Sequence, residues 1–411
     1  LHPSLIIHDA GHDNDGHPIW RLHHPVSNKY FQISWVEFEC LSRFSMCQNA
    51  QELADKIHKD TTLSIDLSDI ITLLEFLKQN ALLAGASFEY TEASKTALWK
   101  RIVHHYLYFT IPLFKPDHFL KITYPYVQWF FSRIFFKISL FILFISTFLT
   151  IGRLDEFTHT FFRFFSLEGA ITIFVVFFII KILHELGHAY TAHKHGVNVP
   201  HMGLAFIVLY PILYTETSNA WLLNSRDKRL EIGLAGIRTE LIIAAYALAA
   251  WHILPPGLLQ SLAFSILAIS LIGSLLINLN PLMRFDGYFV WSDYLGIENM
   301  HARGFTAAKW ALRKFLFGLK TPPPEHKEGQ LRFLIAFGFA TIIYRFFLFL
   351  GIAILVYHIF FKPLGLLLFL IEISWFILLP IANELKIWWK LKGKILVERR
   401  TYFTLGITTL L

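Results

Sequence analysis

Two histidines and a glutamate within five residues are the part of the sequence best suited to chemistry. Residues 184–188 read HELGH and lie at the end of an apolar run that starts at Gly169. If this run is helical, residues four apart lie on one face, so His184 and His188 present their imidazoles to the same point. The HExxH spacing is typical of a zinc site in which the histidines bind the metal and Glu185 is the general base.

Neutral imidazole ligands leave the charge of Zn²⁺ intact, so the ion lowers the pKa of a bound water from about 15.7 to about 7. Glu185 would take a proton from that water and pass it to the leaving amine. A chance match is the alternative, because the chain has 20 His in 411 residues and short motifs carry a false-positive risk. The stretch 170–180, however, has no charged residue, and ionisable groups in a membrane helix are usually functional. The metal interpretation is therefore favoured.

The composition is typical of a polytopic membrane protein. Hydrophobic residues make up 55% of the chain, charged residues only 16%, and there are 41 Phe. The net charge of +7 does not indicate nucleic-acid binding, because the basic residues cluster beside apolar runs, as the positive-inside rule predicts. The expected environment is a lipid bilayer.

Six membrane spans are predicted from apolar runs close to the length that a hydrocarbon core of about 30 Å requires. The flanking Lys and Arg place residues 1–90 in the cytoplasm and the HELGH sequence near the cytoplasmic end of the second span. Residues 201–214 are apolar but too short to cross, which predicts a re-entrant hairpin whose edge could pair with an extended substrate. The predicted spans are about 134–151, 170–192, 231–254, 259–281, 333–360 and 364–386.

The predicted fold class is an all-α polytopic membrane protein, with about six transmembrane helices and a re-entrant hairpin, preceded by a small α+β winged-helix-like domain. Short strands are expected at Trp20–Leu22 and Lys29–Ile33, followed by helices at 34–44, 50–58 and 67–83. The predicted domains are a cytoplasmic domain (1–90), an interfacial segment (91–133), the protease membrane core (134–290), a cytoplasmic amphipathic linker (291–332), additional transmembrane helices (333–400) and the start of a further helix (401–411). The natural chain is expected to continue beyond Leu411.

Two histidines do not complete a catalytic zinc site. The expected third ligand is Asp286, which follows the predicted fourth span. The second and fourth spans run in the same direction, so Asp286 comes to the depth of the histidines. Zinc ligation also removes the desolvation cost of a buried carboxylate.

With both motifs in view, the sequence resembles the site-2 protease family of intramembrane zinc metalloproteases, peptidase family M50. The family pattern N-x-x-P-x-x-x-x-D-G is matched at Asn278, Pro281, Asp286 and Gly287. Phe285 stands where the family usually has Leu, and this difference is expected to alter the substrate groove. The resemblance implies that zinc is bound by His184, His188 and Asp286, that Glu185 is the base, and that Asn278 orients substrate or stabilises the oxyanion.

Narrower resemblances suggest partners. Residues 202–221 and the NPLMRFDGY stretch look like M50-type proteins associated or fused with HlyD-like membrane fusion proteins. Residues 16–41 are similar to PqqD-like domains that recognise leader peptides. Together, these resemblances imply a peptide or transmembrane-helix substrate, HlyD-like and transporter subunits as partners, and a location in the bacterial inner membrane. The strand near Tyr30–Ile33 would accept a peptide by strand addition, or the domain is a structural cap that binds nothing.

The predicted function is hydrolysis of a peptide bond in a membrane-embedded or exported peptide, in bacterial peptide maturation or export. The alternative is a non-catalytic membrane scaffold or export component, although a structural zinc site has no need of Glu185. A di-iron enzyme is disfavoured because the His23-His24 and His104-His105 pairs lack the preceding histidine of HxxHH. Arg238 and Glu240 are interpreted as buried structural partners of one another or of the re-entrant segment.

Overall fold

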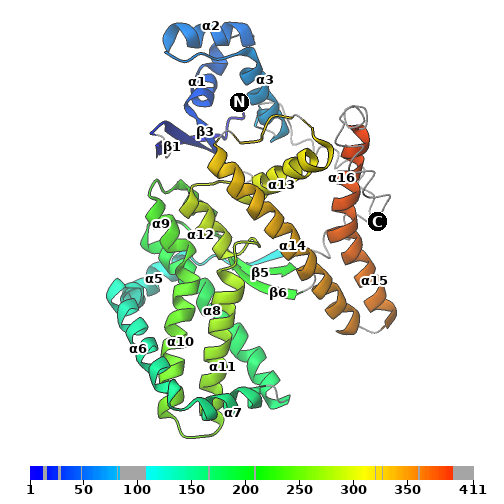
Figure 1. Cartoon of the computed structure of the whole chain (residues 1–411). Coiled ribbons are helices and arrows are strands. Elements are labelled where there is room, and N and C mark those ends of the chain that lie inside the picture. Colours follow the sequence, from blue (N-terminus) through cyan, green and yellow to red (C-terminus); the bar gives the residue numbers. More distant parts are fainter. Residues whose placement is uncertain are drawn as a thin grey trace, which may run out of the picture. The chain divides into compact units, whose positions relative to one another are not determined.

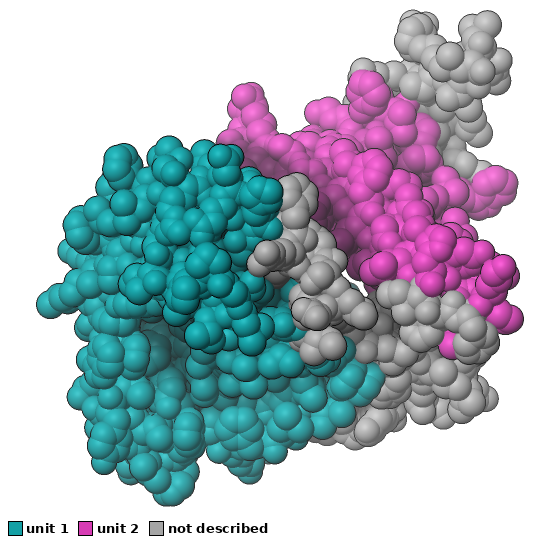
Figure 2. Space-filling view, turned by 90° about the horizontal axis from the view of Figure 1, so that it is seen from below, with its two compact units in different colours: residues 1–274 teal, residues 275–411 magenta. Residues whose placement is uncertain are grey.

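The computed structural model forms two compact units, residues 1–274 and 275–411 (Figure 2). It describes residues 1–12, 16–25, 29–47, 49–80, 82–83, 108–164, 167–207, 210–319, 321–325, 327–359 and 362–391. The predicted helix at 401–411 and most of the predicted junction around residue 90 lie outside these ranges. Each unit is described by itself.

The first unit begins with a three-stranded antiparallel sheet in the order β1-β2-β3. Its strands are β1 (Ile6–His12), β2 (Pro18–His24) and β3 (Lys29–Ser34), and the elements that follow are α1 (Trp35–Arg43), η1 (Phe44–Met46), α2 (Ala50–Asp60) and α3 (Leu67–Gln79). Ser34 forms a capping box with Glu37, which fixes the start of α1 directly after the strand. The predicted strands and helices of this region are therefore observed, and β1 is an additional strand.

The membrane-like part of the first unit is a group of apolar helices. Their bounds are α5 (Asp117–Val127), η2 (Gln128–Phe131), α6 (Arg133–Ile151), α7 (Leu154–Phe164), α8 (Leu167–Lys194), η3 (Ser218–Leu222), α9 (Arg226–Gly233), α10 (Ala235–Ile253) and α11 (Leu258–Ile272). Helices α8, α10 and α11 pack against one another, and α6 packs against α10 (Figure 1). Trp251 of α10 is fully buried at the centre of the α10–α11 contact.

Helix α6 exposes apolar side chains and buries polar ones, which is the opposite of what is expected for a helix in water. Its large apolar side chains are exposed, with Phe144 68% exposed, whereas Ser139, Ser146 and Thr150 are buried. The Thr150 hydroxyl is 3.0 Å from Nε2 of His252 on α10. Small and hydroxyl residues at helix contacts, with apolar side chains outside, are typical of helices that face lipid.

A second three-stranded sheet lies beside these helices, so the expectation of an all-α membrane part is wrong. Strands β5 (Met202–Ile207) and β6 (Tyr210–Thr215) form the hairpin predicted near residues 201–214, and β4 (Tyr108–Phe114) pairs with β5. The order is β4-β5-β6, all antiparallel. A strand from the predicted interfacial segment thus covers one edge of the hairpin, because isolated backbone groups in an apolar environment must be hydrogen-bonded.

The predicted number of six spans is too high. Within the described residues, four helical stretches are long and apolar enough to cross a membrane: Arg133–Ile151, Thr172–Lys194, Glu328–His358 and Lys362–Lys390. Helices α9 and α10, bent by 48° at their junction, add a fifth if they form one span. The span predicted at 259–281 is instead the 15-residue α11 followed by the π-helix η4 (Gly273–Asn278). That α-helix is shorter than the ~20 residues a span requires.

The second unit consists of the end of η4 and six further helical elements. These are α12 (Asp286–Leu295), α13 (Met300–Phe317), α14 (Glu328–Ile359), α15 (Lys362–Ile373), η5 (Ser374–Leu378) and α16 (Leu379–Lys390). Helix α13 packs on α14, and Gly304 and Gly338 allow their backbones to meet closely. The predicted linker at 291–332 therefore contains a well-formed packed helix.

Candidate metal centre

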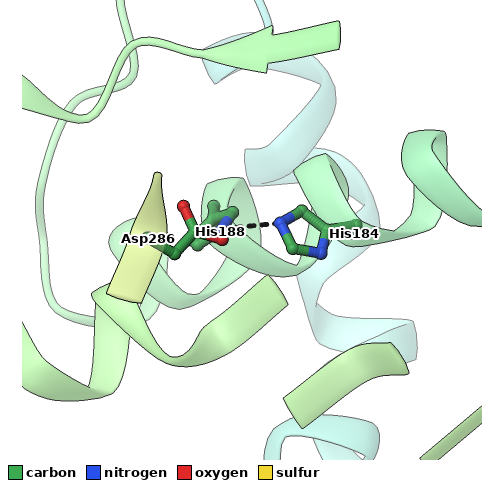
Figure 3. A group of neighbouring side chains, drawn as sticks. All are labelled: His184, His188 and Asp286. Atoms are coloured by element: carbon green, nitrogen blue, oxygen red, sulfur yellow. Dashed lines mark hydrogen bonds between the residues drawn. The ribbon is translucent and has the colours of Figure 1, made fainter. Parts of the chain in front are cut away.

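His184 and His188 lie one turn apart on α8 and face each other. Their Nε2 atoms are 3.2 Å apart, and both side chains are buried, with His184 3% and His188 6% exposed (Figure 3). The helical spacing predicted from the sequence is thus confirmed. The two rings present the same nitrogen to a common point.

The other nitrogen of each ring meets a hydrogen-bond acceptor. Nδ1 of His188 donates to the carbonyl of Ile232 over 2.8 Å, beside the bend between α9 and α10. Nδ1 of His184 is 2.8 Å from the carboxylate of Glu240 on α10. These contacts assign the Nδ1–H tautomer to both neutral rings, so both Nε2 atoms present lone pairs. Two lone pairs aimed at one another favour a cation at that point.

The spacing of the two nitrogens fits zinc. Two Zn–N bonds of about 2.05 Å at a tetrahedral angle place the nitrogens about 3.3 Å apart. The observed separation is 3.2 Å. Carboxylate and carbonyl partners on the far side of the rings are also the usual outer shell of a zinc-binding histidine. The donor set therefore fits the metal that the sequence predicts.

Gly236 provides the space for the two rings. A Cβ atom added at this position would collide with Nε2 and Cε1 of His184 and with Nε2 of His188. Gly187 has a related role, because a Cβ there would meet Thr239 and the Ala235 carbonyl on α10. Two glycines, one on each helix, thus let α8 and α10 approach closely enough to enclose the histidines.

Asp286 is the acidic member of the group. It opens α12, and its carboxylate and the two histidines each offer one ligand atom within 4.8 Å of the others (Figure 3). A carboxylate in the first turn of a helix is also stabilised by the backbone dipole. Within the second unit, a Cβ on Gly287 would strike the Asn278–Leu279 backbone, so this glycine lets the loop fold back against α12.

Glu185 and Asn278, the two other residues predicted for the site, do not belong to this group. The Glu185 carbonyl accepts a hydrogen bond from Thr215 Oγ1 over 3.1 Å, and its side chain lines a cavity beside α8. Asn278 is buried at the end of η4. Among the described residues, the group that could hold a metal ion here consists of two histidines and one aspartate.

Lys181 and Glu240 were not singled out as site residues from the sequence. Glu240 is fully buried, and its Oε1 is 2.6 Å from Lys181 Nζ as well as 2.8 Å from His184. The predicted pairing of Arg238 with Glu240 is wrong. Arg238 donates instead to the Ser132 carbonyl over 2.5 Å and lies 3.5 Å from Glu231. The sequence feature that could have identified this pair is the presence of two opposite charges, Lys181 and Glu240, in two apolar helices.

Comparison with known proteins supports a metallopeptidase at a coarse level. Neither a protein-family model nor a solved structure matches the chain significantly. Over 128 residues, 31% of its length, the chain is 27% identical to a Bacillus subtilis (strain 168) protein named "Putative peptide zinc metalloprotease protein YydH". The matched part spans about half (49%) of that relative. The chain is thus a distant homologue of a protein named as a peptide zinc metalloprotease, and four or five of its helical stretches are suited to a membrane.

Proposed function

We propose that this protein is an intramembrane zinc metallopeptidase of the M50 type, which hydrolyses a peptide bond of a membrane-embedded or exported peptide. The observation that carries the proposal is the group formed by the buried His184 and His188 and the half-buried Asp286, with Glu185 directly after the first histidine. Support also comes from the apolar helices around the site and from the name of the distant relative.

The three ligand residues would hold Zn²⁺, which supplies a Lewis acid that polarises the scissile carbonyl and acidifies water. Glu185 takes a proton from the attacking water on its carboxylate and delivers it to the nitrogen of the leaving amine. Glu240 and the Ile232 carbonyl hold the two imidazoles in the Nδ1–H tautomer. The Asn278 amide donates to the carbonyl oxygen of the scissile bond, which orients the substrate.

The cellular setting is part of the proposal. The bacterial inner membrane would contain the apolar helices, with the N-terminal domain in the cytoplasm, because Lys194, Arg226 and Lys228 flank the ends of α8 and α10. HlyD-like and transporter subunits, and leader-peptide binding by a PqqD-like domain, rest on the family resemblance. Labelling of Cys47 in spheroplasts tests the orientation: only a membrane-permeant maleimide should reach it.

The metal site is tested by zinc analysis of purified protein. The parent should hold about one zinc per chain, and Asp286→Ala should lose most of it. Asp293→Ala, a change of the same type on α12 outside the His-His-Asp group, is the matched control and should keep its zinc. A parent without zinc, or an Asp286→Ala variant that retains it, would remove the basis of the proposal.

Catalysis is separated from a scaffold role by Glu185→Gln. This variant should keep its zinc and lose roughly 10²- to 10⁴-fold of the cleavage rate of quenched-fluorescence apolar peptides in proteoliposomes, because it lacks the general base. Equal product formation by parent and variant would instead favour the non-catalytic alternative.

A further inference from the structure

A cavity of about 270 Å³ lies in the first unit against the face of α8 that carries Glu185. Its walls come from β4, α5, α8, β5 and β6, so the second sheet and the HExxH helix build it together. The lining is almost entirely apolar, and Glu185 and Tyr214 are among the residues that contribute to it. The lining residues are Leu113, Phe114, Phe119, Ile182, Glu185, Leu186, Met202, Gly203, Leu213 and Tyr214.

The shape of the cavity is set by an irregularity in the sheet. Pro112 pairs with Gly203, but the next pair is Phe114 with Met202, so Leu113 is an extra residue in β4. Such a bulge bends the strand and redirects its side chains. A Cβ on Gly203 would strike the Ile111 carbonyl, so the two strands meet closely at this point. Leu113 and Phe114 are thereby placed at the cavity.

Strand β6, which forms one wall of the cavity, is hydrogen-bonded to helix α8. Thr215, the last residue of β6, donates through its hydroxyl to the Glu185 carbonyl over 3.1 Å. Leu213 and Tyr214 of the same strand line the cavity, as does Glu185 itself. A side chain bound here would therefore lie next to the group proposed to transfer the proton.

The rim of the cavity is apolar and exposed. Leu113 is 58% exposed, and Phe114, Phe119 and Ile182 also have large exposed fractions. Ile182 belongs to the part of α8 that is suited to a membrane. Exposed apolar groups of this size mark a binding surface or contact with lipid, so the mouth favours ligands that arrive from an apolar phase.

We propose that this cavity is a specificity pocket that receives one large apolar side chain, aromatic or branched aliphatic, of the peptide next to the bond that is cut. The inference rests on the proposed peptidase function. An apolar cavity of about 150 Å³ is enough to bind benzene, so 270 Å³ accommodates a phenyl or isobutyl group. The apolar walls cannot solvate a charged side chain, so the cavity disfavours acidic and basic residues.

The test uses the full-length zinc protein in proteoliposomes and quenched apolar peptides that differ at one position near the cleaved bond. Parent protein should cleave Phe or Leu peptides roughly 10- to 200-fold more efficiently, by kcat/KM, than the Ala, Lys or Asp peptides. Leu213→Trp, which fills the pocket, should remove this preference. A parent that prefers Lys or Asp, or shows no preference, overturns the proposal.

Ile212→Trp is the matched control. Ile212 is the neighbour of Leu213 in β6 but is not among the residues that line the cavity, so this substitution should leave the preference intact. Zinc content at the parent level shows that each variant is folded. If Ile212→Trp and Leu213→Trp have equal effects, the pocket is not responsible for selection.

Photocrosslinking separates failure of the pocket from failure of the peptidase function, because it requires binding but no cleavage. An apolar peptide that carries benzoylphenylalanine should label lining residues of the parent, and Leu213→Trp should reduce this label at least fivefold. Label without cleavage would uphold the pocket and reject the peptidase. Cleavage without label in the lining would uphold the peptidase and reject the pocket.

Discussion

The arrangement of the two histidines requires that position 236 has no side chain. Gly236→Ala should displace both imidazoles, because the new Cβ would occupy the space of His184 and His188. We expect this variant to lose most of its zinc in metal analysis. Gly329→Ala, in a helix position with nothing within 4 Å of the new Cβ, is the control and should retain zinc. Full zinc in the Gly236→Ala protein would contradict the arrangement described here.

Glu240 orients His184, and Lys181 neutralises Glu240. Glu240→Gln should therefore weaken zinc binding by roughly 10- to 100-fold, as loss of an outer-shell partner commonly does. The substitution also leaves the Lys181 ammonium without its carboxylate. An uncompensated ammonium should lower the yield of folded protein. The double variant Glu240→Gln with Lys181→Met removes this charge, so it should restore the yield but not the zinc affinity, which is measured by competition with a chelator. Recovery of affinity in the double variant would mean that the carboxylate only balances charge.

At the level of single residues, the sequence predicts the candidate metal ligands better than the residues that hold those ligands in place. His184, His188 and Asp286 are recognisable because zinc chemistry requires particular residue types at fixed spacings. The sequence suggests that Arg238 and Glu240 are partners of one another or of the re-entrant segment. Residues two apart on a helix do not face each other, so that pairing was unfavourable from the start. The nearest opposite charge in another apolar helix, Lys181, was the better candidate.

Helix α6 provides a test of the membrane environment. A spin label at position 144, in a Cys40→Ser, Cys47→Ser background, should collide more with oxygen than with a water-soluble nickel chelate, because Phe144 is on the exposed apolar face. A label at position 146 should be shielded from both, since Ser146 is buried towards α10. Higher accessibility to nickel at position 144 would show that this face is in water.

Cys40 on α1 provides a pH-dependent prediction. Burial, with the negative charges of Glu37, Asp69 and Glu39, raises the pKa of its thiol to about 11. The folded state therefore holds this proton more tightly than the unfolded chain, whose cysteine titrates near 8.5, and the stability of the fold around α1 falls as the pH rises from about 9 to about 11.

Alkylation with iodoacetamide, followed by mass spectrometry, checks this pKa. The rate at Cys40 should keep rising to about pH 11 in native protein. In denaturant, the rate at the same residue should level off near pH 8.5. A plateau below pH 9 in the native protein would disprove the shift.

Strand β4 marks the limit of prediction at the level of elements. The β5–β6 hairpin could be anticipated because its two strands are adjacent in sequence and Pro211 interrupts a helix there. Strand β4 could not, because its partner β5 begins at Met202, long after Phe114. Pro112 also argues locally against a strand, since proline cannot donate to the ladder. The bulge beside Pro112 resolves that conflict, and no local pattern reveals it.

The first unit holds its N-terminal sheet against the loop before α9 through two hydrogen bonds. Arg21 donates to the Leu223 carbonyl over 3.0 Å, and the Tyr30 hydroxyl donates to Asn219 over 2.7 Å. Arg21→Met with Tyr30→Phe should accelerate hydrogen exchange in η3, because each lost bond removes about 1 kcal/mol. Tyr126→Phe, at an exposed tyrosine, is the control and should leave exchange unchanged. Equal exchange in all three proteins would show that these bonds do not hold the sheet.

For the whole molecule, the sequence predicts the environment more reliably than the number of crossings. The apolar composition and the basic flanks indicate a membrane protein directly. The fourth predicted span failed because hydropathy measures composition and not backbone geometry: the α-helix ends at Ile272, and the π-helix after it leads to the turn that precedes α12 and Asp286. Residues 273–281 were counted as membrane helix because most of them are apolar.

The pairing of β4 with β5 also has a consequence for the order of events during synthesis. Tyr108–Phe114 leaves the ribosome long before Met202–Thr215, and the α-helices α5 to α8 lie between them in the chain. The cavity beside Glu185 needs walls from both segments, and the metal group needs Asp286 later still. A nascent chain that already displays HELGH thus has neither its pocket nor its third ligand. The metal group can therefore assemble only after Asp286 has been added to the chain.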